Sequence, residues 1–162
     1  MKRENAIIAN VFLAAVVTLI LAACAARAQP VESGGTAWGT GAFRSNGERI
    51  YFTATSERGT AISYTGGPSS NGWMMGGGRF ACASCHGPDG RGGAHSMGMM
   101  QVMTAPDIRW SALEGEFDAE LFRLAVVKGE DPNGTQLSTD MPRFTIGSDD
   151  LADLIAYLET LP

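Results

Sequence analysis

A chain of 162 residues, 44% of them hydrophobic, has room for one domain and a targeting segment. Its 12 basic and 17 acidic side chains give a net charge of −5. Without the first 23 residues the net charge is −6, and such a surface disfavours nucleic acid and anionic lipid headgroups as partners.

The N-terminus has the pattern of an export signal, which we place at residues 1–28. Lys2 and Arg3 precede an almost wholly apolar run, IIANVFLAAVVTLILAACAA, that ends in small residues. Because the basic residues hold the N-terminus in the cytoplasm, the rest of the chain is expected in the periplasm or on the outer face of the membrane.

Three outcomes for this signal stay open. Residues 21–24 (LAAC) resemble the lipobox of bacterial lipoproteins, and cleavage before Cys24 would leave that residue as a lipid-bearing membrane tether. The sequence before Gln29 fits the A-x-A cleavage rule for a soluble product. Without cleavage, a run of about 20 apolar residues is long enough to span a bilayer.

Residues 29–44 are rich in Gly, Ser and Thr and predict a flexible tether before a domain at 45–162. The domain is expected to begin with a short helix that has Ser45 or Asn46 as its cap and Tyr51 beside Gly47 on one face. Residues 58–79 are rich in Gly and Ser and predict a loop or small hairpin, with 61–64 as a candidate strand.

Cys82, Cys85 and His86 form a C-x-x-C-H motif, the attachment signature of c-type haem. On a helical turn the two sulfurs share one face and can bond one edge of a porphyrin, while His86 projects over the ring toward the iron. A redox dithiol needs no adjacent histidine, and a zinc site would have to recruit His95 into a strained cluster. We therefore predict one covalently bound haem c with His86 as an iron ligand.

The stretch that follows, residues 87–107, is rich in Gly and Met and is expected to wrap around the cofactor without regular structure. It holds His95 and four methionines, Met97, Met99, Met100 and Met103. Met74 and Met75, which precede the Cys pair, are grouped with them. These thioethers have three open interpretations: flexible packing at the haem edge or a partner surface, Cu(I) binding, or replacement of the axial ligand. His95 is interpreted as a polar loop residue, because it lies too near His86 in sequence to cross the ring.

Two stronger helices complete the chain. The first is predicted at 117–128, with Asp118 in its first turn and Gly129 after its end, and the second follows Ser148 as its cap. Between them, Met141 opens the tetrapeptide MPRF, 55 residues beyond His86, far enough to reach the other face of the ring. We predict that its thioether is the sixth iron ligand, which favours Fe(II) and raises the redox potential.

These elements supply too little apolar surface for the number of residues to be ordered. Short helices joined by glycine-rich loops bury little area, at about 25 cal/mol per Å², against the conformational entropy of some 110 residues. An apolar group that is not polypeptide is therefore expected to fill the centre.

Taken together, residues 45–162 resemble the class I c-type cytochromes. The resemblance rests on Gly47 and Tyr51 in the first helix, CASCH at 82–86, APD at 105–107, the helix ending at Lys128, MPRF at 141–144 and DLIAYL at 153–158. It implies an all-α fold of short helices around one haem, with long Gly- and Met-rich loops.

The resemblance also implies particular contacts. Gly47 would let the first and last helices cross closely, with Tyr51 and Tyr157 packed at the crossing. The Pro106 carbonyl would accept a hydrogen bond from His86. Arg109 and Trp110 would donate to the haem propionates, although surface packing explains that pair equally well.

The resemblance implies a protein without bond chemistry of its own, which passes single electrons between a donor and an acceptor redox protein. This chain departs from the family in its long segment 53–80 and its enlarged loop 94–103, which leaves the partner undetermined. Three alternatives stay open: a haem subunit fixed in a terminal oxidase or dehydrogenase complex, an enzyme or gas sensor with an open iron, and a cytochrome with an added copper-binding role.

Overall fold

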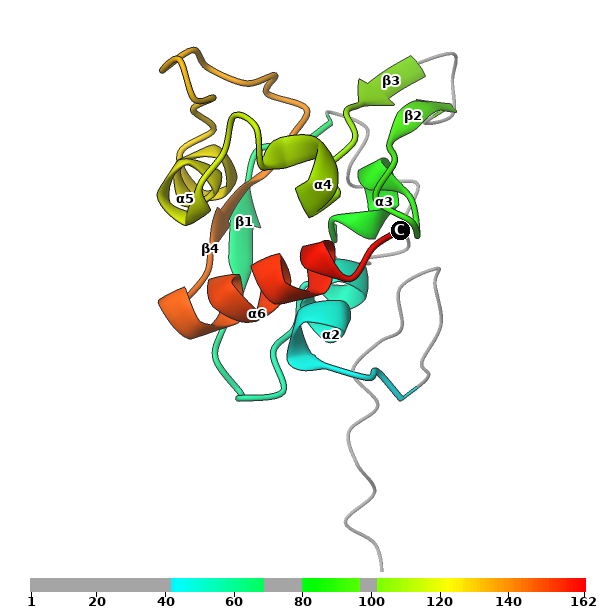
Figure 1. Cartoon of the computed structure of the whole chain (residues 1–162), viewed down its shortest axis with the longest axis vertical. Coiled ribbons are helices and arrows are strands. Elements are labelled where there is room, and N and C mark those ends of the chain that lie inside the picture. The colour runs from blue at the N-terminus through cyan, green and yellow to red at the C-terminus, as the bar shows by residue number, and fades with distance from the viewer. Residues whose placement is uncertain (1–41, 69–79, 97–101) are drawn as a thin grey trace, which may run out of the picture. The chain divides into compact units, whose positions relative to one another are not determined.

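Five short helices and two pairs of short strands make up the described part of the chain, which comprises residues 42–68, 80–96 and 102–162 of the computed structural model (Figure 1). The predicted export signal, residues 29–41 of the predicted tether and Met74, Met75, Met97, Met99 and Met100 lie outside the described residues. Within them, no helix has the length and apolar character that a membrane span requires.

Helix α2 (Asn46–Thr53) begins where the sequence predicts. Ser45, and not Asn46, is its cap: the Ser45 hydroxyl accepts a hydrogen bond from the backbone N–H of Glu48 at 3.1 Å. The helix ends at Ala54, which adopts a left-handed conformation with φ of 50°.

The crossing of α2 with α6 (Ser148–Glu159) depends on Gly47, as the resemblance implied (Figure 1). A Cβ at Gly47 would overlap the backbone carbonyl of Asp153, so only glycine allows this approach. The rings of Tyr51 and Tyr157 pack beside it with centroids 5.2 Å apart. The Tyr51 hydroxyl donates to the Gly87 carbonyl at 2.6 Å and so links the crossing to α3 (Ala83–His86).

The other two helices are α4 (Trp110–Leu113), which the sequence did not predict, and α5 (Ala119–Val127). Asp118 caps α5 by accepting a hydrogen bond from the Leu121 N–H at 2.8 Å, so the helix begins two residues later than expected. The predicted cap of α6 was wrong by one residue, because Gly147 is the cap and Ser148 is the first helical residue.

Two short antiparallel strand pairs add a little sheet to the mainly helical fold that was predicted. β1 (Ser63–Thr65) pairs with β4 (Arg143–Thr145), and β2 (Gly93–Ser96) pairs with β3 (Val102–Ala105). β1 overlaps the candidate strand predicted at 61–64, and its partner is the distant strand β4. The β2–β3 pair corrects the expectation that residues 87–107 have no regular structure. Both pairs satisfy backbone polar groups of segments whose composition cannot sustain a helix.

The main core is a cluster of apolar side chains from α2, α5, α6 and the segments between them, and Cys85, Met103 and Ala105 form a second, smaller cluster. Tyr51 and Leu158 are the fully buried members of the main core, and Phe122, Phe144 and Leu154 carry it to the wall of a cavity.

Candidate functional site

A cavity of about 480 Å³ lies beside this core, a volume typical of sites for organic cofactors, which run from roughly 300 to 1,000 Å³. Its walls come from α3, β3, α4, α5, the loop 137–142 and α6. Most of the lining is apolar and includes Phe80, Leu113, Phe117, Phe122, Phe144 and Leu154. Such a wall favours an apolar occupant.

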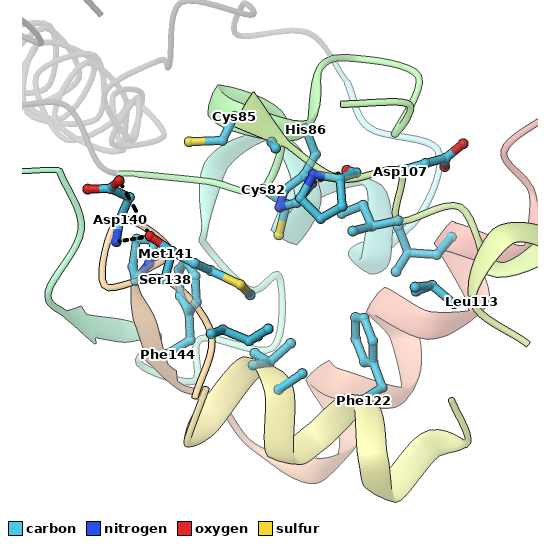
Figure 2. A pocket seen from close by; sticks show the side chains of 18 of the residues that line it. Cys82, Cys85, His86, Asp107, Leu113, Phe122, Ser138, Asp140, Met141 and Phe144 are labelled. Atoms are coloured by element: carbon cyan, nitrogen blue, oxygen red, sulfur yellow. Dashed lines mark hydrogen bonds between the residues drawn. The ribbon is translucent and has the colours of Figure 1, made fainter. Parts of the chain in front are cut away.

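The two cysteines of the C-x-x-C-H motif line this cavity (Figure 2). Cys82 is the cap of α3 and Cys85 is inside it, so one helical turn presents both thiols, as predicted; they form no disulfide. Burial raises the pKa of Cys82 to about 12, and burial together with the charge of Asp140 raises the pKa of Cys85. Neither thiol therefore has the low pKa that a reactive redox dithiol requires.

His86 follows at the end of α3 and is only 7% exposed. Its Nδ1 lies 2.8 Å from the backbone carbonyl oxygen of Pro106, the contact that the resemblance implied. A carbonyl can only accept, so Nδ1 carries the proton and the lone pair belongs to Nε2, the nitrogen that a metal would bind. The contact thus fixes both the tautomer and the orientation of the imidazole.

Met141 reaches the cavity from a different element, the loop that leads into β4 (Figure 2). The imidazole of His86 and the thioether of Met141 point into the same cavity from different sides (Figure 2). Met103 on β3 is a second lining thioether, 7% exposed and packed against Cys85 and Ala105. It is the member of the predicted methionine cluster whose side chain is described.

Arg109 and Trp110 do not belong to the described lining of the cavity. The Arg109 guanidinium forms a bidentate contact with Asp107, with Nη2 and Oδ2 2.6 Å apart, and donates to the Pro162 carbonyl at 2.5 Å. The Trp110 ring packs edge-on against Phe122, with centroids 6.0 Å apart. Their assignment to the haem propionates gains no support from this arrangement.

Several lining residues were missed by the sequence analysis. Glu116 and Asp140 add carboxylate side chains to the lining of the cavity, and Phe122 and Phe144 add apolar wall. Phe144 stands within MPRF, a signal that was used for Met141 alone. The carboxylates carry no such signal, because acidic residues are common in loops.

These residues fit a covalently bound haem. Two thiols from one turn, an oriented imidazole, a thioether from a separate loop and an apolar wall converge on one cavity. No group of three or more His, Cys, Asp or Glu side chains within the described residues is arranged to hold a metal ion by itself.

Comparison with protein-family models matches residues 76–162 to the cytochrome c family. The match covers more than half of the chain and includes the C-x-x-C-H motif and Met141. Neither the curated proteins nor the solved structures gave a match.

Proposed function

Because the chain belongs to the cytochrome c family, we propose that it carries single electrons between redox proteins outside the cytoplasm. The family binds haem c covalently, with iron, and transfers electrons through it; Cys82 and Cys85 fit its attachment motif. The observation that carries the proposal is the convergence of Cys82, Cys85, His86 and Met141 on one apolar cavity.

Each residue has a separate part in the proposal. The thiols of Cys82 and Cys85 would hold the haem through thioether links, and His86 Nε2 and Met141 Sδ would be the ligands of its iron. The haem supplies a one-electron couple. The Pro106 carbonyl holds the imidazole, and the apolar wall limits the water that would otherwise reorganise when the charge changes.

The place of action and the partners are proposed from the sequence. The export signal 1–28 supports a periplasmic position or one on the outer face of the membrane, with a lipid on Cys24 as the tether. A donor and an acceptor redox protein would meet the chain through small, short-lived interfaces. Co-purification of a partner chain in fixed ratio after mild detergent extraction would instead indicate a subunit fixed in an oxidase or dehydrogenase complex.

The test of the ligand assignment is the Met141→Leu variant of the haem-loaded protein. We expect the haem to stay attached, carbon monoxide to bind the reduced iron, and the potential to fall. The fall should reach about a tenth or more of the roughly 0.8 V that axial ligands span. Absorption spectroscopy and a redox titration measure these changes.

Met103→Leu is the matched control, because it removes a buried sulfur from the same cavity. It should leave the spectrum and the potential close to those of the unchanged protein. If Met103→Leu produced the changes and Met141→Leu did not, the axial sulfur would be reassigned to Met103.

A further inference from the structure

The loop that carries Met141 is held from within by the side chain of Arg143. Nη1 of Arg143 donates to the Met141 carbonyl at 2.5 Å. Nη2 donates to the carbonyls of Leu137 at 2.8 Å and Ser138 at 3.3 Å. One guanidinium thus gathers three backbone carbonyls of a five-residue stretch that ends at the predicted ligand.

The end of α5 forms the seat for this guanidinium. Gly129 follows the helix with φ of +70°, and a Cβ there would overlap Nε and Cζ of Arg143. The Gly129 carbonyl also accepts a hydrogen bond from the Leu137 N–H at 2.7 Å, so the first residue of the loop 137–141 is bonded to Gly129. The glycine that ends α5 therefore also makes room for Arg143.

This arrangement matters because Met141 packs against the core from a loop, so the position of its thioether depends on the position of that loop. A thioether is a neutral ligand, and a competing ligand gains access when the loop swings away. The apparent affinity of the competitor scales with the fraction of molecules in which the loop is open. Any side chain that ties the loop shut lowers that fraction.

We propose that Arg143 is a positioning residue for Met141, holding the loop 137–141 closed so that the thioether stays in the cavity. The inference rests on the proposed function, in which Met141 ligates the iron. Arginine suits this task because its planar fork donates to several carbonyls at once, whereas a lysine ammonium offers one compact centre.

Backbone contacts that do not involve the Arg143 side chain also hold the loop 137–141, so an Arg143 variant is expected to fold. β1 pairs with β4 directly after the loop, and the Gly67 N–H donates to the Thr139 carbonyl at 3.1 Å. Replacing the Arg143 side chain leaves these backbone contacts in place.

The experiment compares Arg143→Gln with Arg123→Gln in the haem-loaded protein. Both remove one positive charge, but Arg123 lies on α5 and pairs with Glu120 at 2.6 Å, apart from the loop. For Arg143→Gln we expect the oxidised protein to bind imidazole at least about tenfold more tightly, and the sulfur-to-iron charge-transfer band to weaken. Arg143→Lys should give an intermediate affinity, and Arg123→Gln should give the affinity of the unchanged protein.

Equal imidazole affinities for Arg143→Gln and Arg123→Gln would overturn the proposal. If Met141→Leu still changed the spectrum in that case, the ligation by Met141 would stand and only the role of Arg143 would fail. A spectrum unchanged in Met141→Leu would remove the ligation itself. Should Arg143→Gln yield no folded protein, Arg143→Lys decides: tighter imidazole binding supports the role of Arg143, and an unchanged affinity rejects it.

Discussion

At the scale of single residues, Asp150 joins the two ends of the domain. This carboxylate is 1% exposed, yet it accepts hydrogen bonds from Asn46 at 2.9 Å, Ser56 at 2.6 Å and the Thr60 hydroxyl. Burial by itself would raise the pKa of Asp150, but these hydrogen bonds and the nearby Arg58 lower it overall. Asp150 therefore stabilises the fold as a charged, fully bonded group.

Asp150→Asn should lower the free energy of unfolding at pH 7 by about 2 kcal/mol, because the amide cannot accept all of these hydrogen bonds. The folded pKa lies below the unfolded one, so the contribution of Asp150 is complete above about pH 4 and is lost as the pH falls through the folded value. Urea unfolding of the haem-loaded protein at pH 7 and near pH 3 measures the effect.

Asp149, the exposed residue next to Asp150, provides the control for this measurement. Asp149→Asn removes the same charge from the first turn of α6 and should cost well under 1 kcal/mol. The difference in free energy of unfolding between Asp150→Asn and the unchanged protein should become smaller at acid pH. If this difference in free energy were the same at pH 7 and pH 3, the role of the ionised carboxylate would be contradicted.

At the scale of elements, the long segment between α2 and α3 packs against β4 through its strand β1. In this pairing, Tyr64 lies opposite Phe144 in the register. The Tyr64 ring packs on Phe144 and Phe80, with centroids 5.7 and 5.9 Å away. The segment therefore supports the strand that follows Met141 and Phe80, which lies two residues before Cys82.

Tyr64→Ala should lower the free energy of unfolding by about 2 kcal/mol, since two aromatic contacts are lost from a half-buried site. Tyr64→Phe keeps both rings and loses only the hydroxyl that accepts from the Phe80 N–H at 3.3 Å, so it should cost less than about 1 kcal/mol. Urea unfolding of both variants with haem attached tests this order. Equal losses would show that the hydroxyl, and not the ring packing, holds the segment.

At the scale of the whole molecule, one side of the polypeptide core forms part of the wall of the cavity. The apolar side chains on the cavity wall, such as Phe122 and Leu154, complete their packing only against an apolar occupant. Folding of the domain and attachment of the haem are therefore expected to be coupled.

The double variant Cys82→Ala, Cys85→Ala should leave a largely unfolded chain, because the covalent links to the apolar occupant are lost. Circular dichroism and amide hydrogen exchange measure the remaining structure. Val102→Ala, at a residue 64% exposed, is the control and should retain both haem and fold. A cooperative thermal transition in the haem-free double variant would show that the polypeptide folds by itself.

The sequence by itself determined the features that depend on neighbouring residues. The spacing of Cys82, Cys85 and His86 places all three on one turn of α3, and the signals at Ser45, Asp118 and Gly129 place helix ends to within two residues. Helix periodicity and capping act over three or four residues, so a reader of the sequence can recognise them. The match to the cytochrome c family confirms the class that these motifs indicated.

Only the tertiary structure decided which distant groups meet. β1 and β4 are about 80 residues apart in the sequence, and the sequence of neither strand predicts that it pairs with the other. For Arg109 the sequence left the propionates and surface packing open, and the structure pairs its guanidinium with Asp107. Arg143 was given no role, and its guanidinium donates hydrogen bonds to carbonyls of the loop that carries Met141. Charged side chains and short strands have several chemically equivalent partners, and the fold selects among them by bringing only one within reach.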